Sequence, residues 1–285
     1  MDKVIGLGSL GCAVAEDLSQ HPEYRIYKID SLIEERGSLS LGALNNMEAH
    51  EKNVDSVEVA VYLRSIRPDD EVLCVVGGGD PVAGAILRIL ETIKDAKISI
   101  LYICPERTMS SEIQKRDDKI AFNVLQEYAR SGVLERIFLV DQSSIEELME
   151  DAPVHQYHQQ ISHFISHLVA MINYFNHTNP VLSSRLELPD MCRIATFGVS
   201  SLEGARDVNF LFPLEPIAGL HFYYGIPEKQ LETDTTLIKR IKEHVKDFKN
   251  AAESVSYSIH PTTYDRMMVL CLCFSVKIQL LCDSQ

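Results

Sequence analysis

The chain has 285 residues, 46% of them hydrophobic, and a formal net charge of −14 at pH 7. A chain of this length and hydrophobic content can bury one large core or two smaller ones, and no apolar run approaches the roughly 18 residues of a membrane span. The acidic balance and the scattered Lys and Arg residues argue against a nucleic-acid binder, because phosphate backbones require clustered basic side chains. Small molecules and other proteins remain as partners, with no insertion into a membrane.

The compartment is indicated by the N-terminus and the cysteines. The first residues enter a strand directly, without the charged and apolar regions of a secretion signal. The seven cysteines are an odd number, lack CxxC spacing and stand mostly in apolar runs. We therefore expect reduced thiols in a cytoplasmic protein.

Strand and helix patterns alternate through the first half of the chain. Apolar runs predict strands at 3–7, 24–29, 72–76, 98–104 and 137–140. Helical spacing predicts helices at 12–18, 54–66, 80–94 and 111–131, and residues 31–53 are expected to form an irregular loop. The helix from 111 begins with the capping box Ser111 and Gln114 and carries apolar residues at 113, 120, 124, 125 and 128. This alternation predicts an α/β fold with a doubly wound parallel sheet and a ligand site at the carboxyl ends of the strands.

The first glycine motif lies between a predicted strand and a predicted helix. Gly6, Gly8 and Gly11 form GxGxxG, and Asp30 follows at about the distance of a ribose-binding acid. This pattern is typical of a dinucleotide site. The alternative is that the glycines only allow the helix to pack closely on the strand.

The second glycine motif consists of Gly77, Gly78 and Gly79, and the other predicted elements are arranged around it. It follows a buried strand and precedes Asp80-Pro81, where a helix begins. Glycines let backbone N–H groups approach an anion closely, and a helix N-terminus supplies positive potential there. The motif therefore predicts a phosphate-binding loop.

A long helix is predicted at 153–174 and could connect two domains. His163 and His167 on it have the spacing of a metal pair, but no Cys or carboxylate ligand stands beside them in the sequence, so we expect packed or solvated histidines and no metal site. Strands are then predicted at 193–200, 220–224, 254–259 and 267–281, with a helix at 237–248. We expect a nucleotide-binding domain at 1–152, a connecting helix at 153–178 and a smaller α+β domain at 179–285.

This order of elements resembles the tubulin/FtsZ superfamily of GTP-binding filament proteins over nearly the whole chain. The segment GLGSLGCAV from Gly6 to Val14 is similar to the FtsZ glycine run that precedes Cys-Asn-Ala-Val. Gly77 to Gly79 match the start of the family motif GGGTGTG, and Glu112 with Arg116 match its Glu-x-x-x-Arg.

The resemblance implies a site for GTP or GDP, with Mg²⁺ as a candidate cofactor. The implied nucleotide-binding residues are Gly6, Gly8, Gly11, Cys12, Gly77, Gly78, Gly79, Asp80, Glu112, Arg116 and Gln160. In the family, a loop after the long helix carries two acids that complete the GTPase site of the next subunit in a head-to-tail filament. Glu187 and Asp190 have that spacing and are the candidate catalytic residues; the alternative is a polar turn in which Asp190 acts as a cap.

One segment departs from the family pattern. Asp80-Pro81-Val82-Ala83 replaces Thr-Gly-Thr-Gly, which removes two hydroxyl donors and one backbone N–H. Asp80 can cap its own helix, and its carboxylate a few Å from a phosphate costs about 1–4 kcal/mol unless a cation bridges them. Two functions remain open, a GTP-hydrolysing filament protein and a non-catalytic scaffold of the same fold. A ThiF-type adenylyltransferase, suggested by GLGSLGC, is less favoured because paired CxxC zinc ligands are missing.

Overall fold

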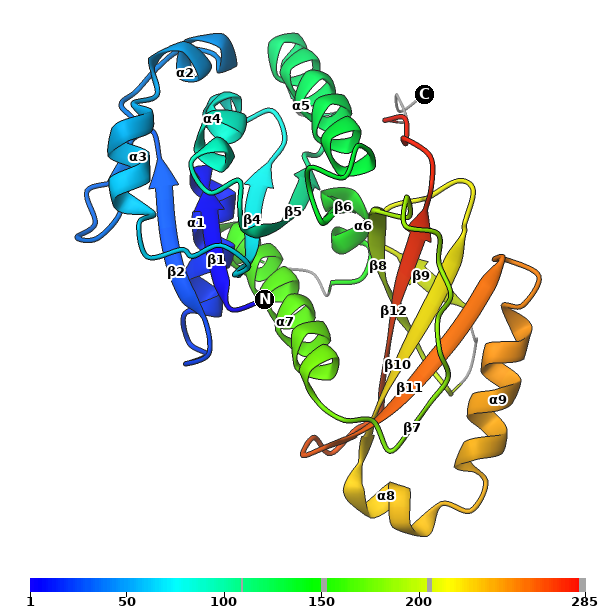
Figure 1. The fold of residues 1–285 in the computed structure, drawn as a ribbon. Coiled ribbons are helices and arrows are strands. Elements are labelled where there is room, and N and C mark those ends of the chain that lie inside the picture. The colour runs from blue at the N-terminus through cyan, green and yellow to red at the C-terminus, as the bar shows by residue number, and fades with distance from the viewer. Residues whose placement is uncertain (109, 150–152, 204–206, 282–285) are drawn as a thin grey trace.

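The computed structural model describes residues 1–108, 110–149, 153–203 and 207–281 (Figure 1). The strands are β1 (Lys3–Leu7), β2 (Arg25–Asp30), β3 (Leu39–Ser40), β4 (Glu71–Gly77), β5 (Lys97–Cys104), β6 (Arg136–Asp141), β7 (Leu182–Ser183), β8 (Ile194–Ser200), β9 (Val208–Phe210), β10 (Gly219–Pro227), β11 (Ser254–Thr262) and β12 (Met268–Ser275). The helices are α1 (Gly8–Leu18), α2 (Met47–Asn53), α3 (Ser56–Tyr62), α4 (Ile86–Glu91), α5 (Glu112–Arg130), α6 (Gln142–Glu146), α7 (Tyr157–His177), α8 (Glu228–Thr233) and α9 (Leu237–Asp247), with short 3₁₀ helices η1 (Pro81–Ala85) and η2 (Val154–Gln156).

The strands form one continuous sheet. Its first part has the parallel order β3-β2-β1-β4-β5-β6, which confirms the predicted doubly wound sheet. β8 joins β6 in parallel through Ile137–Ile194 and Phe138–Ala195, and the order then continues through β12, β10, β11 and β7 with mostly antiparallel pairs. The predicted domain limits stay a prediction, and residue 152 lies outside the described residues. α7 lies between the two parts of the sheet (Figure 1).

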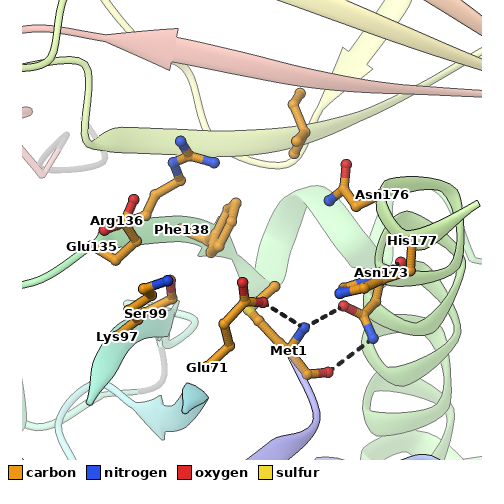
Figure 2. Close-up of a pocket in the computed structure, with 11 residues that line it drawn as sticks. Met1, Glu71, Lys97, Ser99, Glu135, Arg136, Phe138, Asn173, Asn176 and His177 are labelled. Atoms are coloured by element: carbon orange, nitrogen blue, oxygen red, sulfur yellow. Dashed lines mark hydrogen bonds and ion pairs between the residues drawn. The ribbon is translucent and has the colours of Figure 1, made fainter. Parts of the chain in front are cut away.

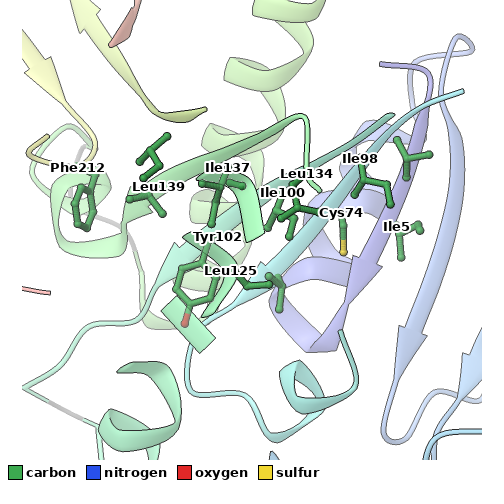
Figure 3. Packing of buried hydrophobic residues seen from close by; sticks show 14 of the residues in the cluster. Ile5, Cys74, Ile98, Ile100, Tyr102, Leu125, Leu134, Ile137, Leu139 and Phe212 are labelled. Atoms are coloured by element: carbon green, nitrogen blue, oxygen red, sulfur yellow. The ribbon is translucent and has the colours of Figure 1, made fainter. Parts of the chain in front are cut away.

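Two hydrophobic layers cover the parallel strands because successive side chains point to opposite faces. Ile5, Cys74 and Ile100 face a layer that includes α3, α4 and α5 (Figure 3), whereas Val4 and Leu101 face α1 and α7. The six cysteines within the described residues are all buried and free. No helix in the described part of the chain is long and apolar enough to span a membrane.

The expected loop at 31–53 is wrong in part, because α2 and the short strand β3 lie within it. The polar sequence of α2 hid it: Asn46 caps its first turn by accepting from the N–H of Ala49 at 2.8 Å, and its buried residue is a histidine, His50. A helix with so little apolar surface gives a weak periodic signal.

The face of α5 that packs on the sheet differs from the face that the spacing of apolar residues predicts. Its capping box is confirmed, and Leu125 is 1% exposed, but Ile113 and Ile120 are 61% and 52% exposed. The buried stripe instead begins at Asp117 and Asp118 and continues through Phe122, one turn later. The helix is therefore oriented by a buried carboxylate as well as by apolar side chains.

α7 is held against α1 by a carboxylate. Asp17 of α1 accepts a hydrogen bond from the Ser162 hydroxyl at 2.6 Å and lies 3.3 Å from His163 Nδ1. His167 is turned toward its own helix, with Nδ1 2.7 Å from the His163 carbonyl oxygen. Within the described residues, no group of three or more His, Cys, Asp or Glu side chains is arranged to hold a metal.

Candidate functional site

The two glycine loops meet at the point where the strand order reverses. β1 pairs with β4, yet the chain passes from β1 to β2 on one side and from β4 to β5 on the other. The crevice at such a switch point is where open α/β sheets bind ligands. The loops after β1 and β4 therefore form the candidate site.

Gly6 and Gly11 allow α1 to pack tightly on the sheet. A Cβ atom on Gly6 would lie 2.4 Å from the Gly11 carbonyl oxygen, and one on Gly11 would lie 2.3 Å from the Val75 carbonyl oxygen. The Cys12 thiol lies 3.3 Å from the Gly6 carbonyl oxygen, and burial raises the pKa of this thiol to about 12. These contacts support the packing interpretation for two of the three glycines, and Cys12 remains a protonated thiol.

Gly8 is different, because an acidic side chain covers it. Its φ of +75° favours glycine, and a Cβ atom there would lie 2.4 Å from Asp80 Oδ2. α1 has no side-chain cap from its own preceding residue, Leu7, and no acid in its first turn. Asp80 supplies this negative charge from the other loop, and the backbone N–H of Ser9 stabilises the charged carboxylate. The N-terminus of α1 therefore already holds an anion.

Asp80 also caps its own helix, as the sequence suggested. Its Oδ1 accepts from the N–H of Val82 at 3.0 Å, at the start of η1. Burial raises the pKa of Asp80, mainly through loss of water and secondarily through the charge of Asp30, while the hydrogen bonds from Val82 and Ser9 oppose the rise. The carboxylate is half-buried between the two loops.

Several donors of the second loop are already in use. The N–H of Gly78 donates to the Ile103 carbonyl oxygen at 2.8 Å, and that of Ala83 donates to the Asp80 carbonyl oxygen at 3.0 Å. Pro81 has no N–H. Gly77 continues β4, and Gly79, with a φ of +71°, contacts the first turn of α5. A phosphate arriving here must compete for these N–H groups.

A buried polar cluster supports Gly78 from below. Asp118 is fully buried and accepts a 2.6 Å hydrogen bond from the Tyr102 hydroxyl, while Arg107 Nη2 lies 3.2 Å from its other oxygen. A Cβ atom on Gly78 would lie 2.1 Å from Asp118 Oδ1. Burial raises the pKa of Asp118, and the Tyr102 and Arg107 bonds counter it. This cluster is not predicted from the sequence, although Asp118 stands four residues before the apolar Phe122.

The implied contacts from Glu112 and Arg116 are not preformed. Glu112 is paired with Lys115 at 2.9 Å and points to solvent. Arg116 is exposed, bonds Asp117 at 3.2 Å, and lines a groove of about 600 Å³ between α2, α4 and α5. The residues of α5 that reach the glycine loop are Gln114 and Asp118: the Gln114 carbonyl oxygen would lie 3.3 Å from a Cβ atom on Gly79, and Asp118 Oδ1 would lie 2.1 Å from one on Gly78.

Gln160 is half-buried near the start of α7. That end of α7 contacts α6, since the Tyr157 hydroxyl lies 3.0 Å from Gln142 Nε2. Next to α6, the carboxyl ends of β5 and β6 enclose a cavity of about 110 Å³ between Arg107 and Asp141. This volume is below the 300–1,000 Å³ usual for ligand pockets, so a nucleotide would have to widen it.

Glu187 and Asp190 are exposed and lie far from the glycine loops. Leu188, between them, packs over Gly219 at the start of β10. Five strand steps separate β4 from β10, which at about 4.8 Å each is roughly 24 Å. One chain therefore does not bring these acids to the loops.

His50 is a second residue that the sequence analysis missed, since it lies in the expected loop. It is 1% exposed, and within the described residues neither ring nitrogen has a hydrogen-bond partner. A positive charge at this position would lower the pKa of Asp80 and so favour its ionised carboxylate.

No protein-family model matches the sequence, and no curated protein matches it. Solved structures do. The GTPγS-bound protofilament of CetZ2 from Haloferax volcanii has a TM-score of 0.74 at 14% identity, covering 96% of this chain and 92% of that one. An empty FtsZ dimer from M. jannaschii gives 0.70 at 14%, covering 96% and 88%. A GTPγS-form TubZ protofilament from Bacillus thuringiensis gives 0.71 at 13%, covering 97% and 87%.

The chain has the tubulin/FtsZ fold. This confirms the fold predicted from the glycine motifs and the order of elements. At such low identity the likeness establishes the tubulin/FtsZ fold alone. The roles of individual residues have to be argued from the site itself.

Proposed function

We propose that this protein is a self-associating protein of the tubulin/FtsZ fold that binds a guanine nucleotide between its two glycine loops, in competition with Asp80. The main observation behind the proposal is the position of the Asp80 carboxylate, which lies against Gly8 and interacts with the backbone N–H of Ser9. A helix N-terminus that accommodates a carboxylate has the potential and the N–H groups that a phosphate needs. The similar CetZ2 and TubZ structures are GTPγS-bound or GTPγS-form protofilaments, which supports this choice of ligand and assembly.

Phosphate and Asp80 cannot share this place without a cost. At about 4 Å, two like charges repel by roughly 1–4 kcal/mol for effective dielectric constants between 80 and 20. In this proposal the nucleotide binds when Asp80 turns away from α1, or when a cation such as Mg²⁺, held by Asp80, would offset the repulsion. Val82 is bonded to Oδ1, whereas Oδ2 is the oxygen that faces Gly8, so the capping bond can persist when Oδ2 leaves Gly8 or meets the cation.

Hydrolysis, in this proposal, needs a second copy of the chain. Glu187 and Asp190 lie on an exposed segment and are too distant to act on their own glycine loops. A head-to-tail neighbour could present them to the phosphates, where a carboxylate can orient or activate water. Free, buried cysteines support a cytoplasmic location.

The second candidate is a non-catalytic scaffold of the same fold. It is favoured by the N–H groups of Gly78, Val82 and Ala83, each of which already has an acceptor within the chain. With Asp80 as a built-in anion, the site could stay closed and the protein could assemble without nucleotide.

Calorimetric titration of the full chain separates the two candidates. GTP, GDP and ATP are titrated with and without Mg²⁺ into wild type and Asp80→Asn, which keeps a good cap but removes the charge. Asp55→Asn is the matched control, because Asp55 caps α3 in the same way through Val57 at 2.8 Å, on a different helix. Sedimentation velocity on the same samples reports self-association.

We expect Asp80→Asn to tighten GTP binding at least about fivefold without Mg²⁺, and Asp55→Asn to leave it unchanged. No binding of GTP or GDP to either protein, and none after restoring Thr-Gly-Thr-Gly at 80–83, would select the scaffold. Nucleotide-independent assembly in that case would support it directly.

A further inference from the structure

A cavity at the opposite edge of the sheet from the glycine loops has no role in the function proposed above. It encloses about 430 Å³ between the amino-terminal ends of the parallel strands and the last turns of α7. Figure 2 shows Arg136 and Phe138 extending from β6 on one side and Asn176 and His177 of α7 on the other. This volume is in the range of small-molecule sites.

Arg136 is a largely buried cation that has no carboxylate partner among the residues that the structure describes. Its guanidinium lies 5.0 Å from the ring centre of Phe274 and 5.9 Å from that of Phe138. Its Nε is buried and has no hydrogen-bond partner among the described residues. Burial lowers the pKa of Arg136, as loss of water disfavours its charge. Cation–π contacts compensate only part of that loss.

The acids at the rim of the cavity are paired with other cations. Glu71 binds the N-terminal ammonium of Met1 at 3.0 Å (Figure 2), and Glu135 lies 3.6 Å from Arg193 Nη1. Glu135 favours the charged form of Arg136 through its field but forms no ion pair with it in the described structure. The cavity therefore keeps an excess positive charge.

Further groups suit an anion with an apolar body. Lys97 of β5 lines the cavity opposite Glu71 on β4, whose pKa is lowered by its hydrogen bond from the Met1 ammonium and also by the charge of Lys97, but Lys97 forms no ion pair within the described part of the chain. Ser99, next on the same face of β5, adds a hydroxyl, and Phe138 and Leu272 supply apolar walls. A buried charge without a counter-ion is costly, and a bound oxyanion would offset that cost.

We propose that this cavity is a binding site for a small organic anion, whose carboxylate or phosphate group binds Arg136 and Lys97 and whose apolar body packs against Phe138 and Leu272. Carboxylate and phosphate both match the planar donors of a guanidinium. The site lies apart from the glycine loops, so its ligand binds whether or not guanine nucleotide does.

The test uses benzoate and phenyl phosphate as probes and benzamide as the uncharged analogue of benzoate. Calorimetry on the full chain should show saturable binding of at least one anion and none of benzamide at the same concentration. The anion that binds more tightly shows whether the site prefers a carboxylate or a phosphate group. Arg136→Met should weaken that anion about tenfold or more, and Lys97→Met about threefold or more. Lys119→Met, which removes an exposed lysine from α5, is the matched control and should change nothing.

Two outcomes would overturn the proposal. One is benzamide binding as tightly as benzoate, which would leave only an apolar pocket. The other is no saturable binding of either anion at about 10 mM, which would make Arg136 a packed cation held by its phenyl neighbours. If Arg136→Met does not fold, the comparison of benzoate with benzamide on wild type and Lys97→Met decides the question.

Discussion

Removing the Tyr102 hydroxyl should weaken the support beneath the second glycine loop. The hydroxyl donates to Asp118 Oδ1 at 2.6 Å, and both residues are fully buried. A hydrogen bond to an ionised acceptor contributes about 1.5–3 kcal/mol. In Tyr102→Phe, Asp118 keeps its contact with Arg107 but loses this donor. We therefore expect a loss of about 2 kcal/mol in the free energy of unfolding, without a cavity of consequence.

Urea unfolding followed by circular dichroism measures this loss. Tyr223→Phe is the matched control, since Tyr223 is also buried and its hydroxyl donates to the neutral amide oxygen Asn176 Oδ1 at 2.7 Å. A neutral bond contributes about 0.5–1.5 kcal/mol, so Tyr102→Phe should cost more than Tyr223→Phe. Equal costs, or a cost under about 0.5 kcal/mol, would refute the reasoning, because Asp118 would then be neutral and its bond not charge-assisted.

Further predictions concern the loops and the distant acids. Gly78→Ala should lower the free energy of unfolding by about 1–3 kcal/mol, because the added Cβ would lie 2.1 Å from a buried carboxylate oxygen. Gly77→Ala is the control: the nearest atom to its Cβ is 3.7 Å away, so denaturant unfolding should show a loss under about 1 kcal/mol. Burial raises the pKa of Asp80 in the folded chain, so the folded state binds the proton more readily than the unfolded state. The free energy of unfolding of wild type, relative to that of Asp80→Asn, should therefore rise as the pH falls through the raised pKa. A difference that does not change with pH would contradict this. Glu187→Gln with Asp190→Asn should abolish GTP turnover in a phosphate-release assay while GTP affinity stays within about twofold, and unchanged turnover would exclude both from catalysis.

The sequence was sufficient wherever the signal is local. Apolar runs place β4 and β5 to within about a residue, and the capping box of α5 and the cap formed by Asp80 depend on neighbours within three residues. Where the local signal is polar, as in α2, the prediction was wrong. The nucleotide roles of the glycines, Glu112, Arg116 and Gln160 stay predictions.

By itself, then, the sequence determined the order of the main strands and helices of the parallel part and the two glycine turns, since periodicity, caps and turns are properties of short segments. This order, together with the family resemblance, predicted the fold. Only the tertiary structure decided what those turns hold. Asp80 reaches the N-terminus of α1, about 70 residues earlier, and the Arg136 guanidinium lies near the rings of Phe138 and Phe274, with no ion pair to an acid in the described part of the chain. Such contacts depend on which strands become neighbours in the sheet and how far each helix is rotated, and no short segment specifies either.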